Sequence, residues 1–433
     1  MRTQSGQALA FLLMVMAALL GGMLFVFDSG QLVAAKLRLL GAADAAAYSA
    51  ASWQARSLNF QAYMNRAVVA NEVAIGQWVS LQAWSAYMNQ ALQKAATVTT
   101  VVPYVGAAMR TLQQSWNNVD TTLQRALPLL ESAASRWNVV VLANASGIAA
   151  AAAPAVADDL ARQVAVRNVA AAGQGVGGQA LRALDRARWL GYTASSTQRA
   201  DGRARLKQVV MDSRDGFTRS RGWTLGLLLL QLRKRGGTDL IGYEGWRGMD
   251  TLALREPVLF GSPERPLAWG ADENHHAALA GRGEHGGSYR DNPRTSARAA
   301  RSVLTAYGYL GLPAYRDLSA AALRNNGELR YELELRQAGS TVATSRYALG
   351  AAATVVPDEQ PKDFAPAYEQ GALHALSAAR LQFVRPEGRA DGREELPSLF
   401  NPYWQARLAP VTVQQRLLAA AARGSSDPYL VLP

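Results

Sequence analysis

The feature that most constrains this chain is a run of 20 residues, 8–27, that contains no charged side chain. At about 1.5 Å of helical rise per residue, this run spans roughly 30 Å, the thickness of a bilayer's hydrocarbon core. A cleavable secretory signal has a shorter apolar stretch that ends in small residues, whereas this run ends in aromatic residues followed by Asp28. We therefore expect residues 1–6 to be a short leader and residues 7–27 to be an uncleaved transmembrane anchor. The anchor residues include Ala8, Leu9, Phe11, Leu12, Leu13, Leu19, Leu20, Phe25 and Phe27.

Composition narrows the class of protein further. The 433 residues include 45 Lys and Arg against 33 Asp and Glu, which gives a formal net charge of +12. A charged fraction of 18%, together with 10 Trp and 15 Tyr, is typical of folded chains and excludes disorder of the whole chain. The absence of cysteine excludes disulfide scaffolds, thiol catalysis and cysteine-ligated zinc or iron–sulfur sites.

After the anchor, the sequence is rich in alanine and in other helix-forming residues. Residues 29–96 contain no proline, so we expect one long helix that continues the anchor. Two further helical runs, 106–144 and 148–169, follow a break at Pro103 and predict an antiparallel return along the first helix. We expect residues 28–198 to form a helical stalk.

A stripe of apolar, mostly small side chains recurs along the long helix at spacings of three, four and seven. It comprises Leu37, Leu40, Ala47, Ala51, Leu58, Ala62 and Val69. Small residues permit close helix packing, so the stripe is either one face of an amphipathic stalk or a surface that bundles with other stalks. The pattern leaves both interpretations open.

Individual residues on this helix are candidates for helix–helix interaction. They are Asp28, Gly30, Ala43, Asp44, Ala47 and Trp53. Asp44 is the strongest candidate, because a carboxylate among alanines on a packing stripe needs a partner charge or a helix terminus; otherwise it occupies an exposed face. A set of aromatic residues would anchor contacts between stalks or pack against the returning helices. This set is Trp53, Tyr63, Trp78, Trp84 and Tyr87.

The distal part of the chain changes to strand-like patterning, and we expect an α+β head over residues 199–400. Residues 329–336 alternate apolar and charged side chains strictly, and with residues 341–347 they predict a hairpin that has one buried face. Further strands are expected at 222–232, 252–259 and 378–384, helical or mixed segments at 297–312 and 367–375, a long exposed loop at 262–295, and a helical tail at 401–433. The predicted fold class is α+β with an antiparallel sheet.

Two motifs have alternative interpretations. Residues 173–178 have the spacing G-x-G-x-x-G of a dinucleotide site, but an alanine-rich helix rather than a strand precedes them, so we expect a flexible inter-helix loop. Residues 199–235 hold ten basic and three acidic side chains, +7 of the net charge. This segment is either a patch for anionic headgroups or an acidic partner, or a set of solvated linker and edge-strand charges. No interleaved aromatic platform for nucleic acid accompanies it.

Signals for catalysis are weak. His275, His276 and His285 share the expected loop with acidic residues, and imidazole with carboxylate suits zinc, although the spacing matches no helix-borne zinc signature. No G-x-S-x-G elbow is present. Glu332 and Glu334 share one face of a strand, and we expect them to be solvated rather than an acid/base pair.

The N-terminal pattern resembles the TadE/TadG-like proteins of the tight-adherence (Flp, type IVb) pilus system. The resemblance rests on residues 6–9 (GQAL), the apolar run, residues 28–30 (DSG) and residues 39–47 (LLGAADAAA), where that family has an alanine-rich stretch with an aspartate. It covers roughly the first 75 residues. A shorter likeness to the C-terminal region of longer TadG-like chains lies in residues 383–386 and 399–408.

The resemblance implies a non-enzymatic, single-pass protein of the inner membrane, with a cytoplasmic N-terminus and its bulk in the periplasm. It also implies membrane and pseudopilin-like partners in pilus assembly, without a cofactor, a nucleic acid or a small-molecule substrate. Gly6 and Gln7 form the candidate site for prepilin peptidase, although relatives that are processed carry Glu where this chain has Phe11. One alternative is therefore a processed minor pilin at the filament tip. An alternative from another class is an envelope-anchored, metal-dependent hydrolase that uses the histidine loop.

Overall fold

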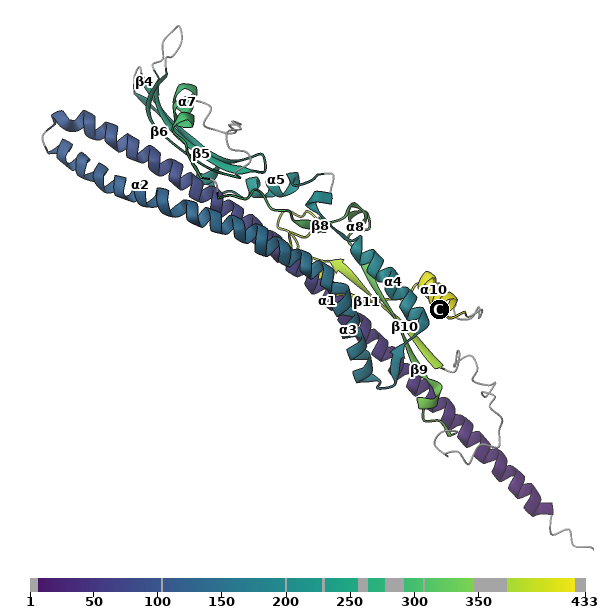
Figure 1. Cartoon of the computed structure of the whole chain (residues 1–433). Coiled ribbons are helices and arrows are strands. Elements are labelled where there is room, and N and C mark those ends of the chain that lie inside the picture. Colours follow the sequence, from purple (N-terminus) through teal and green to yellow (C-terminus); the bar gives the residue numbers. More distant parts are fainter. Residues whose placement is uncertain are drawn as a thin grey trace, which may run out of the picture.

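The computed structural model shows one elongated molecule built around its N-terminal helix (Figure 1). Long helices pack beside that helix, and sheets built mainly from antiparallel strands follow in the sequence. The predicted α+β fold class is therefore confirmed. The structure describes residues 7–102, 104–198, 201–227, 230–255, 264–276, 292–306, 308–345 and 372–424.

Helix α1 (Gln7–Val98) is a single element of 92 residues. It contains no proline and consists mainly of strong helix formers, so no residue in it ends the helix. At about 1.5 Å per residue it is roughly 138 Å long. The prediction that the helix after the anchor continues it is confirmed, because one hydrogen-bonded helix contains both parts.

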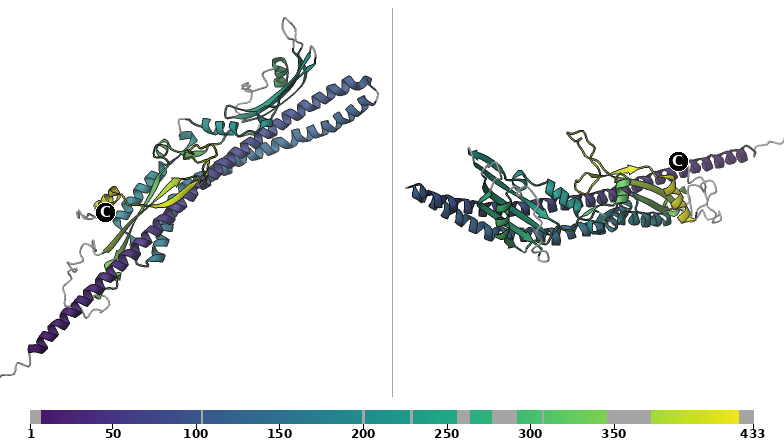
Figure 2. Two further views of the ribbon diagram at one scale, coloured as in Figure 1. Left: turned by 180° about the vertical axis from the view of Figure 1, so that it is seen from behind. Right: turned by 90° about the horizontal axis from the view of Figure 1, so that it is seen from above.

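The chain returns antiparallel along α1. A short turn, η1 (Thr99–Val101), leads to α2 (Val105–Arg136), the π-helical η2 (Trp137–Leu142) and α3 (Ala143–Asn168), which lie beside α1 in both views of Figure 2. The side of α3 that faces inward is made of small residues, which permits close approach of the two helices. These residues are Ser146, Ala150, Ala153, Ala157, Ala161 and Ala165. The predicted return is confirmed.

The predicted apolar stripe on α1 is partly wrong. Ala47, Ala51, Leu58 and Ala62 are fully buried, and Val69 is half-buried, but Leu37 is 63% exposed and Leu40 38% exposed. Leu39 is fully buried instead, because two residues turn a helix by about 200° and so place Leu37 and Leu39 on opposite sides. The predicted spacing is therefore correct from Ala47 onward, but nearer the anchor the buried face of α1 is rotated away from the predicted one.

The sheet nearer the anchor, called the proximal sheet, has four antiparallel strands. Their order is β1 (Ala172–Gln174), β9 (Leu329–Ala338), β10 (Ala372–Phe383) and β11 (Trp404–Ala409). Helix α1 packs on β9, β10 and β11, and the resulting core joins the alanines of α1 and α3 to Tyr331, Leu333 and Leu335. Helices α4 (Val176–Leu190) and α10 (Val413–Arg423) pack on each other, and α4 also packs on β9.

The second sheet, called the distal sheet, lies farther along α1. It comprises β3 (Trp223–Leu227), β4 (Leu230–Ile241), β5 (Gly245–Arg255), β6 (Glu264–His275) and β7 (Leu304–Ala306) in that order, and only β6 and β7 pair in parallel. Helix α1 contacts β4, β5 and β6, with a core that includes Ile75 and Trp246. Helix α7 (Pro293–Arg301) packs on β5 and β6.

Short elements lie between the larger helices and strands. They are β2 (Thr193–Ser195), η3 (Ser196–Gln198), α5 (Ala204–Asp212), α6 (Gly216–Arg219), β8 (Arg316–Leu318), α8 (Ala320–Arg324) and η6 (Gly339–Thr341). Strands β2 and β8 pair with each other. Strands β1 and β2 lie within residues 28–198, and β11 lies within residues 401–433, so strand pairing crosses both predicted segment boundaries.

Several predicted strands differ in their partners. The hairpin of 329–336 with 341–347 is wrong, because β9 pairs with β1 and β10 and a 3-10 turn follows it. Residues 222–232 contain parts of two paired strands, and the expected loop 262–295 contains β6. Residues 372–375 belong to strand β10 rather than to a helix, and the remainder of the segment 367–375 lies outside the described residues. Alternation predicts a strand but does not identify its neighbour.

Candidate interaction site along the N-terminal helix

The first turns of α1 are apolar on every side and uncovered by any described residue. Every residue from 8 to 27 is exposed, and the large apolar side chains range from 39% exposed at Val15 to 71% at Met23. The nine predicted anchor residues all lie in this segment. A second stretch, Val105–Asn168, is also long and apolar enough to cross a bilayer, but it is partly buried and packs on α1. A helix that is apolar all round requires an apolar surrounding.

Contact between α1 and the proximal part of the molecule begins at Asp28. Its carboxylate accepts hydrogen bonds from the backbone N–H of Ser345 at 2.5 Å and from the Ser345 hydroxyl at 2.6 Å. Leu32, Ala35 and Leu39 are the first buried side chains beyond it. The end of the exposed apolar segment therefore coincides with the beginning of the packed stalk.

Asp44 bonds neither to a cation nor to a helix terminus, the two kinds of partner that the sequence suggested. Its carboxylate accepts a 2.6 Å hydrogen bond from the hydroxyl of Ser377 on β10, rather than pairing with a cation or a helix terminus. Ala43 and Ala47 are fully buried within the chain itself. In contrast, Gly30 faces open space and Trp53 is 37% exposed. The six candidate residues thus divide between internal packing and the outer surface of α1.

The stalk aromatics divide in the same way. Trp84 lies edge-on to Trp116 of α2, with ring centroids 5.5 Å apart, and Tyr87 is buried. Trp78 is half-buried, whereas Tyr63 is 56% exposed.

A polar cluster that the sequence analysis missed lies where α1, η2 and the distal sheet meet. Glu72 is fully buried and accepts hydrogen bonds from Tyr309 Oη at 2.8 Å, Asn138 Nδ2 at 2.9 Å and Trp246 Nε1 at 3.2 Å. Burial raises the pKa of Glu72 to about 7, and the three donors offset only part of this effect. The sequence does contain a signal for this cluster, because Glu72 is the only acidic residue between Asp44 and Asp120.

A second buried carboxyl joins α2 to the same sheet. Glu131 accepts hydrogen bonds from Gln82 of α1 and, at 2.7 Å, from Asn274 of β6. Burial raises the pKa of Glu131 to about 7. The pKa of neighbouring Asp272 is raised as well, first by burial and then by the charges of Glu131 and Glu273.

Some cations of the basic segment 199–235 are paired with carboxylates inside the molecule. Arg221 and Lys234 are both buried against Asp250, and the Arg221 Nη2 to Asp250 Oδ2 distance is 2.8 Å. Arg214 pairs with Asp239 in the same way, at 2.7 Å. The interpretation of this segment as a set of wholly solvated charges is therefore wrong for these residues, because acidic side chains outside the segment neutralise them.

The expectation that Glu332 and Glu334 are solvated is also wrong. Helices α4 and α10 cover their face of β9, so that Arg188 Nη1 lies 2.9 Å from Glu332, and Glu334 bonds to Arg423 and to His374. The expected flexible loop at 173–178 instead forms β1 and the first turn of α4. A Cβ at Gly177 would stand 2.3 Å from a Glu334 oxygen, so glycine is required for this close packing.

His275 lies in a strand rather than in the expected loop. His275 is buried in β6 with its Nε2 atom 3.2 Å from Glu273, and the backbone N–H of His276 bonds to the Glu244 carbonyl. His285 lies outside the described residues. Within the described parts of the chain, no group of three His, Asp or Glu side chains is placed to hold a metal ion.

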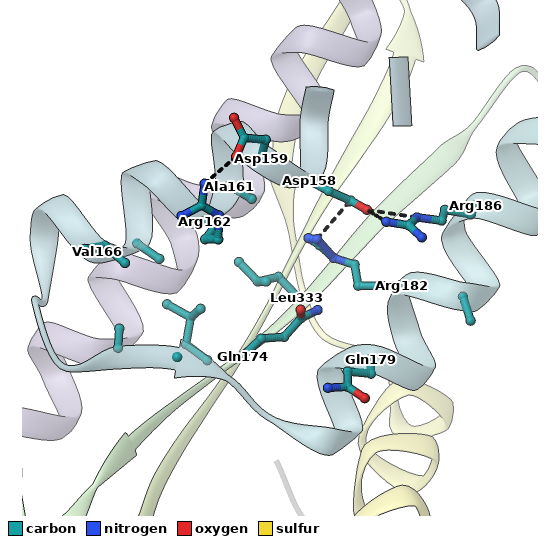
Figure 3. A pocket seen from close by; sticks show the side chains of 15 residues that line it. Asp158, Asp159, Ala161, Arg162, Val166, Gln174, Gln179, Arg182, Arg186 and Leu333 are labelled. Atoms are coloured by element: carbon teal, nitrogen blue, oxygen red, sulfur yellow. Dashed lines mark hydrogen bonds and ion pairs between the residues drawn. The ribbon is translucent and has the colours of Figure 1, made fainter. Parts of the chain in front are cut away.

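A cleft of about 510 Å³ lies between α3, β1 and α4 (Figure 3). Its floor is formed by apolar residues such as Leu333, and its rim carries Arg162, Arg182 and Arg186. Figure 3 shows these arginines turned toward Asp158 and Asp159, and the ion-pair distances are 2.5–2.8 Å. No histidine, serine or threonine is among its lining residues, and both of its carboxylates are paired with arginines.

Comparison with known proteins places the exposed segment and the first packed turns of α1 in one family. Residues 6–54 match a family model described as putative Flp pilus-assembly TadE/G-like. The N-terminal segment of this chain is TadE/G-like. Searches of the curated proteins and of the solved structures gave no match. The TadE/G-like segment supports a role in Flp pilus assembly, and the resemblance noted at residues 383–386 and 399–408 lies outside it.

Proposed function

We propose that this chain is a non-enzymatic, single-pass component of the inner membrane that acts in Flp pilus assembly. Residues 8–27 are the proposed anchor, the leader is cytoplasmic, and the bulk of the chain is periplasmic. The observation that carries the proposal is that the TadE/G-like segment begins as an uncovered apolar helix and continues without a break into a packed stalk. An uncovered helix about one bilayer long is stable when lipid surrounds it.

We further propose that α1 bundles with pseudopilin-like partners just above the membrane. Val33, Leu37 and Tyr48 are 58%, 63% and 48% exposed, and Gly30 and Gly41 face open space on the same part of the helix. In chain order these five residues, 30, 33, 37, 41 and 48, follow one another at spacings of three, four, four and seven. These spacings keep them on one face of the helix. Exposed apolar residues with interspersed glycine permit a second helix to approach closely.

Site-specific cross-linking tests the bundling, and the absence of native cysteine makes it direct. In cells that assemble the pilus, Leu37→Cys should form bismaleimide cross-links to small pseudopilin-like proteins identified by mass spectrometry. The matched control is Leu190→Cys on α4, which is 74% exposed but lies away from this face. Equal cross-linking from both positions, or cross-linking from neither, would contradict the bundling.

One alternative is a processed minor pilin that enters the filament, for which Gly6 and Gln7 form the candidate cleavage site. The mature N-terminus distinguishes the two roles. Mass spectrometry of protein from cells with and without prepilin peptidase should show an intact N-terminus or loss of Met1 alone for a permanent anchor. Peptidase-dependent cleavage after Gly6 would instead assign the chain to the filament.

A further inference from the structure

The end of the helical hairpin farthest from the anchor is an exposed apolar tip. It consists of residues 98–102 and 104–106, at the end of α1 and the beginning of α2 (Figure 1). Its large side chains have exposed fractions between 46% and 92%. They are Val98 at 75%, Val101 at 85%, Val102 at 46%, Tyr104 at 92% and Val105 at 47% exposed.

The backbone of the tip is tightly closed. A Cβ at Gly106 would stand 2.7 Å from the carbonyl oxygen of Thr99, so only glycine permits this approach. Tyr104 has a φ of 64°, which is unfavourable for a side chain of this size, and its ring projects into solvent. Backbone strain that exposes an aromatic ring points to a role for that ring.

The threonine hydroxyls in and next to the tip already have hydrogen-bond acceptors. The hydroxyls of Thr97, Thr99 and Thr100 donate to carbonyls of the preceding turn at 2.8, 2.8 and 2.9 Å. Removing these threonines from water therefore leaves no unpaired hydroxyl donor, and this lowers the cost of desolvating the tip.

The charge around the tip has one sign. Residues 73–119 contain no acidic side chain, and their only basic residues are Lys94 and Arg110, which flank the tip on α1 and α2. Apolar and aromatic side chains with flanking cations are typical of segments that insert into the surface of an anionic bilayer.

The size of the tip favours lipid over a protein partner. A stable protein–protein interface requires about 20–30 residues on each side, and the tip offers fewer than half of that number. Insertion into a bilayer has no such minimum, because each buried apolar side chain contributes separately. Residues 28–98 of α1 extend roughly 105 Å from the end of the anchor to the tip, so the bilayer at the tip is a different one from that at the anchor.

We propose that this tip inserts into the surface of a second, anionic lipid bilayer, so that the chain bridges two membranes. The side chains of Val98, Val101, Val102, Tyr104 and Val105 enter the interface, and Lys94 and Arg110 face the headgroups. This inference relies on the proposed anchoring only for the identity of the first bilayer.

The test uses the full chain held in lipid nanodiscs, mixed with protein-free vesicles of phosphatidylethanolamine and phosphatidylglycerol. The wild-type chain should float with these vesicles, and the double substitution Val101→Asp/Tyr104→Asp should reduce the bound fraction about tenfold. The matched control is Leu190→Asp/Leu396→Asp, which adds the same charge at side chains that are 74% and 75% exposed. The control should bind vesicles as well as the wild type does.

A local readout identifies the part of the chain that inserts. An environment-sensitive fluorophore on Val101→Cys should shift to shorter emission wavelengths when vesicles are added, whereas the same label on Leu396→Cys should not.

Equal vesicle binding by the tip variant and the wild type would overturn the proposal. Absence of vesicle binding, with cross-linking of position 101 to a protein in cells, would overturn it as well and assign the tip to a protein partner. Failure of the chain to enter nanodiscs would contradict the anchor and with it the bridging of two membranes, whereas equal vesicle binding by the nanodisc-held wild type and tip variant would contradict the tip alone.

Discussion

At the scale of single residues, the contact between the helical hairpin and the distal sheet depends on two buried carboxyls. Glu72 of α1 and Glu131 of α2 each bond to side chains contributed by the distal part of the chain. Both have pKa values raised by burial to about 7. The attachment of this sheet to the stalk is therefore coupled to protonation near neutral pH.

This coupling predicts that the folded chain is more stable in mild acid than at neutral pH. The unfolded chain binds the Glu72 proton with the ordinary pKa of about 4.5, and the folded chain binds it with a pKa of about 7. Between these values the folded state holds more protons, so the free energy of unfolding falls as the pH rises, by roughly 3 kcal/mol for each carboxyl. Urea unfolding monitored by circular dichroism between pH 4.5 and pH 8 measures this change.

Glu72→Gln should remove roughly 3 kcal/mol of this pH dependence, because the amide cannot ionise. Glu387→Gln, which changes an exposed carboxylate, serves as the control and should leave the profile unchanged. A profile for Glu72→Gln as steep as that of the wild type would show that another group carries the dependence.

The hydrogen bond between Asp44 and Ser377 allows a second prediction at this scale. Asp44→Ala and Ser377→Ala should each lower the free energy of unfolding, and the double variant should show a coupling of about 1.5 kcal/mol, typical of a hydrogen bond to a charged group. Chemical denaturation of the four proteins in the cycle measures it. Additive losses would mean that Asp44 acts through something other than this contact.

At the scale of elements, glycines set the distance between α1 and the distal sheet. A Cβ at Gly270 of β6 would stand 2.1 Å from the carbonyl oxygen of Ala83, and one at Gly248 of β5 would stand 2.9 Å from that of Val79. On the helix side, a Cβ at Gly76 would stand 2.8 Å from the Trp246 ring. At Gly248 and Gly270 the backbones of helix and sheet are therefore in direct contact.

Gly270→Ala should consequently lower the free energy of unfolding by about 3 kcal/mol, because the backbone of α1 must move away from β6. Gly226→Ala in β3 is the matched control, since a Cβ there meets nothing within 4 Å; it should be neutral or slightly stabilising. Thermal unfolding of both variants compares them, and similar losses at the two positions would contradict this account of the packing.

The helices were predictable from the sequence, whereas the strand neighbours were not. Helix α1 follows from local propensity and the absence of proline over residues 7–98, and both are visible in the sequence. The hairpin predicted from residues 329–347 was wrong because β9 pairs with strands far away in the chain, and short-range patterning contains no information about them. Glu332 and Glu334 were misjudged for the same reason: Arg188 and Arg423 approach them from distant helices.

The candidate site was predicted in part. The exposed apolar segment was identified from the sequence alone, because length and the absence of charge suffice to define it. The Asp44 partner and the Glu72 cluster required the fold, since their donors lie on β10, β5 and the segment around Tyr309. A lone acidic residue in a long apolar helix was the available signal for Glu72.

At the scale of the whole molecule, the chain is a rod with its sheets attached along one helix (Figures 1 and 2). A rod as long as α1 has a radius of gyration of roughly 40 Å, whereas a compact chain of this length would have about 22 Å. Neutron scattering from the full chain in contrast-matched detergent should give a value near the larger figure. A radius near the smaller figure would mean that the hairpin folds back on the head in solution.

The uninterrupted course of α1 past Asp28 has a consequence for orientation about the membrane normal. Only four residues, 28–31, separate the exposed apolar segment from the first fully packed turn at Leu32. Each residue in a helix contributes about 100° of rotation and 1.5 Å of height. Deleting one residue in this interval would therefore turn both sheets by roughly a quarter of a circle around the anchor while hardly changing their height. The azimuth of the head relative to its neighbours in the membrane is thus set by the number of residues in this short interval.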